Sequence, residues 1–209
     1  MQLLVATSNP HKLAELRGVL GPLGITALSL TDVPGGPFPE PVEDGLTFFD
    51  NARIKARAYA RLAQRVALAD DSGLEVDALG GAPGVHSATY AGPEGARAQR
   101  DARNNAKLLN ALQGIPHDRR TARFVCVMCA AAPDGSILAE SRGTFEGVIG
   151  TPPDVPRGTN GFGYDPLLIL PEGNTSAELT EEQKNARSHR GAAARAIAPL
   201  LLQALRART

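Results

Sequence analysis

Two adjacent aspartates, Asp70 and Asp71, follow a short apolar run in the stretch ALADDSGLEVDALGG, residues 67–81. Neighbouring carboxylates repel each other and aspartate is a poor strand former, so a positively charged partner is expected nearby. If the apolar run is a sheet strand, the pair lies at its carboxyl end, where ligands of α/β proteins usually bind. Two carboxylates suit Mg²⁺, and one beside the metal can accept a proton from attacking water. The alternative is that one aspartate only caps a turn.

A second group of acids precedes this pair in the chain. Glu40, Glu43 and Asp44 lie at the end of, or just after, a proline-rich stretch that is predicted to be an extended loop. If the loop folds over the end of the strand, one of these carboxylates can share a metal ion with the aspartates.

The stretch T-S-N-P-H-K, residues 7–12, has the composition of a phosphate-binding turn. It follows a predicted strand over residues 2–6 and precedes a predicted helix from His11 to about Leu20, so free backbone N–H groups and the helix dipole favour an anion there. Its two hydroxyls add donors and its lysine adds a positive charge. An ordinary helix N-cap is the other interpretation, and the spacing of a Walker loop is missing.

The segment R-G-T-N-G-F-G-Y-D-P, residues 157–166, has the composition of a nucleoside-binding loop. Its three glycines allow a close approach of the backbone to a ligand. Phe162 and Tyr164 offer stacking faces for a base, and Asp165 offers a fixed acceptor. The alternative is a glycine-rich loop with packed aromatic side chains.

A basic run, K-N-A-R-S-H-R, occupies residues 184–190. Lys184, Arg187 and Arg190 recur every three residues and are predicted to share one helix face. His189 and Arg190, directly before a glycine, suit contacts to an anion or to the edge of a base. A solvated helix face is the default interpretation of such a run.

The elements that must position these groups alternate between strands and helices. Apolar patterns predict short strands at residues 2–6, 25–30 and 66–69, and long strands at 123–132 and 137–149 that form a hairpin. Helices are predicted after the N-cap Thr47, over 94–113 with a strongly polar face, and from Thr180 to about 206, where Pro199 should kink or split the helix. This order predicts a mixed α/β sheet within a single domain, residues 1–209.

Bulk composition excludes several functional classes. The 209 residues are 43% hydrophobic, with 22 basic and 22 acidic side chains, so no global positive field favours nucleic acid or an anionic membrane. No apolar run approaches the roughly 18 residues of a membrane span, and the N-terminus does not resemble a signal peptide, so a cytoplasmic location is expected. Cys126 and Cys129 lie in a predicted strand, which favours inert core thiols over a metal or redox pair.

Taken together, the motifs resemble the inosine/xanthosine triphosphate pyrophosphatase family, which removes non-standard purine nucleotides. The matching stretches occur in the family's order and span nearly the whole chain: ATSNPHKLAEL, EDGLTFFDNARIKA, ADDSGLEVDALGGAPGVHSATYAG, GTNGFGYDP and LTEEQKNARSHRG. The succession of ADDSGL, GFGYDP and SHRG is highly specific.

The resemblance implies hydrolysis of dITP, ITP and XTP to the monophosphate and pyrophosphate with Mg²⁺. It also implies a homodimer and an elongated mixed central sheet flanked by helices, with two lobes and the active site in the cleft between them. Asp71 would be the catalytic proton acceptor and a metal ligand with Glu43, or with Glu40 as the alternative, while Asp70 is a second acid or a structural acceptor. Substrate contacts would come from Thr7, Ser8, Asn9, Pro10, His11, Lys12, Ser72, Phe162, Gly163, Tyr164, Asp165, Lys184, His189 and Arg190.

One departure concerns the first turn, where the family commonly has T-G-N-x-G-K. Ser8 and His11 replace the two glycines here, and their side chains are expected to narrow the turn. Two other functions remain open from the sequence. One is a Maf-like pyrophosphatase that acts on other modified nucleotides or pyrimidines, and the other is a nucleotide-binding sensor without turnover.

Overall fold

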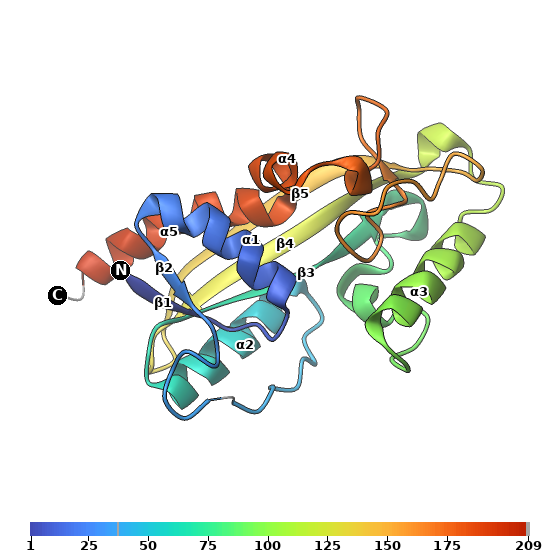
Figure 1. The fold of residues 1–209 in the computed structure, drawn as a ribbon. Coiled ribbons are helices and arrows are strands. Elements are labelled where there is room, and N and C mark those ends of the chain that lie inside the picture. The colour runs from blue at the N-terminus through green and yellow to red at the C-terminus, as the bar shows by residue number, and fades with distance from the viewer. Residues whose placement is uncertain (37, 208–209) are drawn as a thin grey trace. The chain divides into compact units, whose positions relative to one another are not determined.

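The computed structural model describes residues 1–36 and 38–207, and the strands in this part of the chain form one mixed sheet (Figure 1). The strand order is β2 (Thr26–Leu28), β1 (Gln2–Val5), β3 (Ala67–Val76), β4 (Thr121–Ala131), β5 (Ile137–Ile149) and β6 (Leu168–Ile169). β1 pairs in parallel with β2 and β3, whereas β5 and β6 are antiparallel. The predicted mixed sheet is confirmed, and the short β6 was not expected.

Helices connect and flank these strands. The α-helices are α1 (Pro10–Leu20), α2 (Phe48–Ala63), α3 (Arg97–Ala111), α4 (Glu181–Arg187) and α5 (His189–Arg206). Short 3₁₀ turns are η1 (Gly21–Leu23), η2 (Asp77–Leu79), η3 (Gly84–Thr89), η4 (His117–Arg119) and η5 (Ser176–Glu178). Over the described residues, no helix has the length and apolar character needed to cross a membrane.

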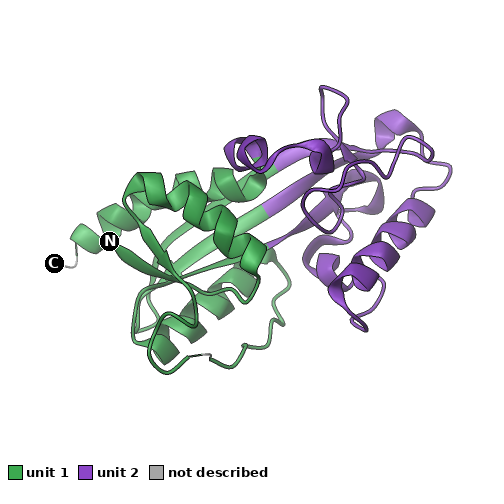
Figure 2. Ribbon diagram, viewed as in Figure 1, with its two compact units in different colours: residues 1–71, 126–144, 188–209 green, residues 72–125, 145–187 purple. Residues whose placement is uncertain are grey.

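The chain divides into two compact units (Figure 2). Unit 1 comprises residues 1–71, 126–144 and 188–209, and unit 2 comprises residues 72–125 and 145–187. The chain passes from one unit to the other within β3, β4 and β5, and again between α4 and α5. Each unit is therefore assembled from segments that are distant in the sequence.

In unit 1, helices α1 and α5 lie on one face of the strands and α2 lies on the other (Figure 1). Alternate strand residues such as Leu3, Val5 and Leu68 pack with apolar residues of α1 and α5 in one buried cluster. Cys126 belongs to this cluster, and it and Cys129 are free and buried, as predicted. Burial raises the pKa of the Cys129 thiol to about 12, so this thiol remains protonated at neutral pH.

The predicted N-cap of α2 is confirmed. Thr47 Oγ1 accepts a hydrogen bond from Asp50 N at 3.2 Å, and Asp50 Oδ2 accepts one from Thr47 N at 3.1 Å. Just before the cap, Gly45 lies so close to the helix that an added Cβ would be 2.5 Å from the Asp50 Cβ. The reciprocal bonds fix the position at which α2 begins, and α2 carries two residues of the site described below.

Replacing this cap should weaken the fold measurably. We expect Thr47→Ala to lower the free energy of unfolding by about 1 kcal/mol, because the backbone N–H of Asp50 in the first turn of α2 loses its acceptor. Urea unfolding followed by circular dichroism would measure this change. Thr47→Ser, which keeps the hydroxyl, is the matched control, and equal midpoints for the two variants would contradict the role given to the cap.

In unit 2, β3 and α3 contribute to a separate apolar cluster. Leu74 and Val76 of β3 pack with Leu108 and Leu112, and the cluster also includes Tyr164. The segment from residue 150 to 167 contains no helix or strand, in agreement with the irregular structure predicted for its glycine and proline content. This irregular segment carries the predicted nucleoside loop.

The predicted end of the third strand was wrong. β3 does not stop before the aspartates but continues through Asp70 and Asp71 to Val76. The poor strand propensity of aspartate is overcome because both carboxylates have basic partners from other elements. The doubled aspartate is therefore part of a strand and not of a turn after it.

The predicted break in the last helix was also misplaced. The chain leaves helical geometry at Ser188, whose Oγ accepts a hydrogen bond from Gly191 N at 3.0 Å as the N-cap of α5, and Pro199 lies inside that helix. Because of this break, Lys184, Arg187 and Arg190 do not share one helix face. Each pairs with its own carboxylate: Asp165, Glu172 and Asp70, respectively.

Candidate active site

Asp70 and Asp71 point to opposite faces of β3, because successive residues of a strand alternate between faces. Leu68 packs beneath α1 and α5, so Asp70, two residues later, faces the same helices. Both aspartates lie just beyond the end of β1, since its last residue, Val5, pairs with Leu68. The two carboxylates therefore have different direct partners, and a metal site shared by both stays a prediction.

Asp70 is buried between basic side chains of α1 and α5. Its Oδ2 lies 2.9 Å from Lys12 Nζ and 3.4 Å from Arg190 Nε. Burial opposes ionisation, but the charges of Lys12, Arg190 and Lys55 outweigh it and hold the pKa of Asp70 well below its ordinary value. Arg190 also pairs with Glu15. Asp70 is thus an acceptor inside the fold that stays ionised at neutral pH.

Asp71 faces α2. Its Oδ1 accepts from Lys55 Nζ at 3.2 Å and its Oδ2 accepts from Asn51 Nδ2 at 3.2 Å. Asn51 and Lys55 are one turn apart on α2, so they share a helix face. Glu43 Oε2 lies 2.6 Å from the same Lys55 Nζ, and the Asn51 Oδ1 accepts from Gly45 N at 2.9 Å. The acidic loop, the helix and the strand therefore converge on one ammonium group.

The pKa of Asp71 is shifted in the opposite direction from that of Asp70. Burial raises the pKa of Asp71 above its ordinary value, although Lys55 and Lys12 oppose the rise. Burial also disfavours the charged form of Lys55, but Asp71, Asp70 and Glu43 outweigh it and raise the pKa of the ammonium. Two carboxylates share one lysine, so the group carries an excess of negative charge and a carboxylate that holds a proton more readily than usual.

The carboxylates of Asp71 and Glu43 fit a magnesium ion. Among the described residues, no group of three or more His, Cys, Asp or Glu side chains is arranged to hold a metal. Mg²⁺, however, is usually held by one or two carboxylates, with waters and substrate phosphates completing its shell. Asp71 and Glu43 both reach Lys55 Nζ, so their oxygens already converge on a position that favours positive charge.

The N-terminal turn forms as the sequence predicted. Asn9 is the N-cap of α1 and its Oδ1 accepts from His11 N at 3.0 Å, with Pro10 in the first helical turn. The Ser8 hydroxyl donates to Glu40 Oε1 at 2.7 Å, so the residue that replaces a glycine links the turn to the acidic loop. Thr7 Oγ1 accepts from the N–H of Asn9 at 3.2 Å. The turn thus lies beside the strand positions that carry the aspartates.

In unit 2, Asp165 organises the predicted nucleoside loop. Its carboxylate accepts from Phe162 N at 2.8 Å, from Ser176 Oγ at 2.5 Å and from Lys184 Nζ at 2.5 Å. Gly161 passes so close that an added Cβ would lie 2.1 Å from Asp165 Oδ2. The lysine and the loop are therefore held by one buried acid, which is 3% exposed.

The two aromatic residues of this loop have different environments. Tyr164 is 4% exposed, lies in the apolar cluster of unit 2 and donates its hydroxyl to the Ser87 carbonyl at 2.9 Å. Phe162 is only partly buried, and the Arg97 guanidinium carbon lies 4.3 Å from its ring centroid. Of the pair, Phe162 is the less buried, and the cationic groups of Arg97 and Lys184 lie over its ring.

The chain that carries these motifs matches a known protein family over most of its length. The model of the Ham1 family matches residues 3–200. This chain belongs to the Ham1 family. A dITP/XTP pyrophosphatase of an Exiguobacterium species is 52% identical over 198 residues, covering 94% of this chain and 95% of that protein. A dITP/XTP pyrophosphatase of Nitratidesulfovibrio vulgaris is 51% identical over 202 residues, covering 95% and 94%.

Solved structures of this family have the same fold. A HAM1 protein from Coxiella burnetii superposes with a TM-score of 0.83 at 39% identity, covering 97% of this chain and 99% of that one. A nucleoside-triphosphatase, dITP/XTP pyrophosphatase, from Mycobacterium abscessus gives a TM-score of 0.72 at 46% identity, covering 96% and 99%. The family and the mixed α/β fold predicted from the sequence are thus confirmed.

Around the two aspartates of this Ham1 chain, the sequence did not predict the contributions of Asn51, Lys55 and Glu15. A signal for the first two existed, because they are four residues apart in the predicted helix after Thr47. Nothing local indicated their partners, which the fold brings from other segments.

For three predicted substrate residues, Arg190, His189 and Ser72, the contact to substrate stays a prediction. Arg190 is 1% exposed and pairs with Asp70 and Glu15, so a contact to substrate stays a prediction for it. His189 is the buried first residue of α5, and Ser72 is partly buried in β3. A contact of His189 or Ser72 with substrate likewise stays a prediction.

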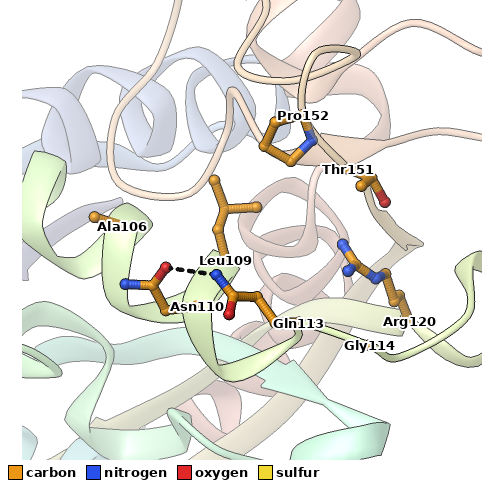
Figure 3. Close-up of a pocket in the computed structure, with 8 residues that line it drawn as sticks. All are labelled: Ala106, Leu109, Asn110, Gln113, Gly114, Arg120, Thr151 and Pro152. Atoms are coloured by element: carbon orange, nitrogen blue, oxygen red, sulfur yellow. Dashed lines mark hydrogen bonds between the residues drawn. The ribbon is translucent and has the colours of Figure 1, made fainter.

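A pocket of about 430 Å³ in unit 2 has none of the predicted site residues in its lining (Figure 3). It is lined by residues of α3, by Arg120 and by Thr151 and Pro152, among others. The Arg120 guanidinium donates to the carbonyls of Ile115, Gly150 and Leu112 at 2.7–3.0 Å. This arginine therefore ties three backbone segments of the Ham1 fold together.

Proposed function

We propose that this protein hydrolyses the non-standard purine triphosphates dITP, ITP and XTP to the nucleoside monophosphate and pyrophosphate. Membership of the Ham1 family supports this function, as do the dITP/XTP pyrophosphatase names of its relatives. The observation that carries it is the convergence of Asp71 and Glu43 on Lys55 Nζ, next to a helix N-terminus suited to phosphate.

In the proposed reaction, water attacks the α-phosphorus and the bond from that phosphorus to the α–β bridging oxygen breaks. Asp71 accepts the proton of the attacking water, and pyrophosphate leaves with the bridging oxygen. The burial that raises the pKa of Asp71 makes this carboxylate a better proton acceptor than an exposed aspartate. Asp70, one residue away on the other face, remains ionised and holds Lys12 and Arg190.

We propose Asp71 and Glu43 as the residues that hold Mg²⁺, with Glu40 as the alternative to Glu43. When bound, the ion withdraws charge from the phosphate oxygens and orients them. Ser8 donates to Glu40 and thereby keeps this acid beside the phosphate turn. The backbone N–H groups and side chains of residues 7–12 are proposed to bind the triphosphate, favoured by the α1 dipole.

For the base, we propose the loop from Phe162 to Asp165 together with Lys184. Phe162 supplies a stacking face, and a donor such as Lys184 pairs with the 6-oxo group of hypoxanthine or xanthine. Adenine presents an amine at this position, so its binding would leave two donors facing each other. Buried polar groups without partners discriminate strongly between substrates.

The proposal predicts fast pyrophosphate release from dITP and XTP with Mg²⁺, and little from dATP, dGTP, dCTP or dTTP. The measurement is a coupled pyrophosphate assay on this panel, each substrate with Mg²⁺ and with EDTA. Loss of release in EDTA would support the metal. Release mainly from a pyrimidine nucleotide would replace the proposal with a Maf-like activity, and tight binding without release would replace it with a sensor.

We further propose that the enzyme acts as a homodimer in the cytoplasm, where the nucleotide pool is. The family resemblance supports both statements. Light scattering of the purified protein at micromolar concentration would give the oligomeric state directly, and a monomeric mass would refute the dimer.

A further inference from the structure

Helix α3 reaches the nucleoside loop with three residues of its polar face. Arg97, Asp101 and Asn105 follow one another at intervals of four, so they line up on one side of the helix. Each contacts the loop of residues 161–165 in unit 2, to which α3 lies close (Figure 1). The strongly polar face predicted for this helix from the sequence thus has a specific partner.

Two of these side chains hold the same residue of the loop. Asp101 Oδ2 accepts from Gly163 N at 3.0 Å, and Asn105 Nδ2 donates to Gly163 O at 3.1 Å. Gly163 has a φ of +64°, and Gly161, two residues earlier, has a φ of +80°. Glycines at positive φ have little conformational preference of their own, so contacts from outside the loop must fix its shape.

The third side chain covers the stacking residue. The Arg97 guanidinium lies 4.3 Å from the centroid of the Phe162 ring, and Arg97 Nε lies 3.9 Å from Asp101 Oδ2. Asp101 therefore contacts both the Gly163 peptide and the arginine that packs on the neighbouring ring. On the other side of the loop, Asp165 accepts from Phe162 N. Phe162 is thus flanked by one acid from α3 and one from its own loop.

We propose that Asp101 and Asn105 are positioning residues for nucleobase recognition: together they fix the Gly163 peptide and thereby set the orientation of Phe162. The inference rests on the proposed function only in taking this loop as the base site. Both side chains contact the Gly163 peptide of the proposed base loop, so both are expected to act on binding and selectivity and not on the chemical step.

The expected effect of Asp101→Ala is a rise of about 10-fold or more in KM for dITP with kcat nearly unchanged, because a hydrogen bond to a charged acceptor is lost. The ratio of kcat/KM for dITP over dATP should fall as well, since a loosened loop reads the base less strictly. Asp101→Asn keeps an acceptor for Gly163 N and should restore most of the wild-type KM. Asn105→Ala should act in the same direction as Asp101→Ala.

The control is Asp118→Ala, which removes an exposed acid from η4 in the same unit. Calorimetric binding of dIMP to each variant gives a second measurement that needs no turnover. Wild-type KM, selectivity and dIMP affinity in Asp101→Ala would overturn the inference while leaving the proposed function intact. A lower Tm with equal losses on all substrates would also overturn it, since that pattern indicates a structural role only. If the wild type bound dIMP but released no pyrophosphate, the proposed function would fail and the dIMP affinities would still decide the inference.

Discussion

Asp71→Asn is expected to lower kcat for dITP by about 10³-fold, because an amide cannot accept the proton of the attacking water and general base catalysis typically contributes 10²–10⁴-fold. The substitution also removes one of the two carboxylates that converge on Lys55 Nζ. Steady-state pyrophosphate release at saturating dITP and Mg²⁺ is the measurement. Raising the Mg²⁺ concentration tests whether weaker metal binding accounts for part of the loss.

The fold should survive this change. Burial already disfavours the ionised form of Asp71, and asparagine has nearly the same shape and keeps an oxygen acceptor for Lys55. Its amide nitrogen replaces the oxygen that accepts from Asn51, so one hydrogen bond is lost and the free energy of unfolding should fall by no more than about 1–3 kcal/mol. Asp118→Asn, an exposed acid in unit 2, is the matched control and should keep full activity. Near-normal kcat in Asp71→Asn would mean that another group accepts the proton.

Features fixed by short-range contacts were predictable from the sequence. The reciprocal bonds of Thr47 with Asp50, and those of Thr180 with Gln183, form within four residues, so the helix starts could be read directly. The strand and turn of residues 2–12 were predictable for the same reason, since the polar residues that cap α1 follow the apolar run. The turn of residues 7–12, which is proposed to bind phosphate, could therefore be predicted from the local sequence.

The different partners of Asp70 and Asp71 could not be predicted from the local sequence. Adjacency suggested one shared oxygen site, whereas the strand places the two side chains on opposite faces. Which face meets α1 and α5, and which meets α2, depends on packing between segments far apart in the sequence. Arg190, for example, is 120 residues from Asp70. Sequence patterns could find both acids but not the partners that distinguish them.

The position of the break between α4 and α5 was also not predictable from residue propensities alone. Pro199 is the stronger helix breaker by propensity, yet the helix ends before Ser188, whose hydroxyl caps the next helix. The break places Lys184 in unit 2 with Asp165, and Arg190 in unit 1 with Asp70. A continuous helix, as the sequence suggested, would have tied these two basic residues to one face.

Arg190→Ala is expected to destabilise the protein by about 3–5 kcal/mol at pH 7, because removing one partner of a buried ion pair leaves uncompensated charge. Asp70 would keep Lys12 but lose the guanidinium, and Glu15 would lose its partner. Chemical denaturation measures the difference. Arg195→Ala is the control on the same helix, since its side chain is exposed and its loss should cost less than about 1 kcal/mol. Equal effects of the two substitutions would contradict the buried pair.

The pH dependence separates loss of this charge pair from simple loss of packing. The pKa of Asp70 is lowered in the folded protein, so its stabilising contribution is fully present above the ordinary value of 3.8 and is lost as the pH falls toward the lower folded value. In the Arg190→Ala variant, the pKa of Asp70 is lowered less than in the wild type. The variant therefore loses less stability as the pH falls. The gap between wild type and variant should therefore narrow below about pH 3.8. If the difference in free energy of unfolding stayed constant from pH 7 to pH 3, the destabilisation would come from the cavity left by the side chain. The ion pair with Asp70 would then not explain why Arg190 is buried.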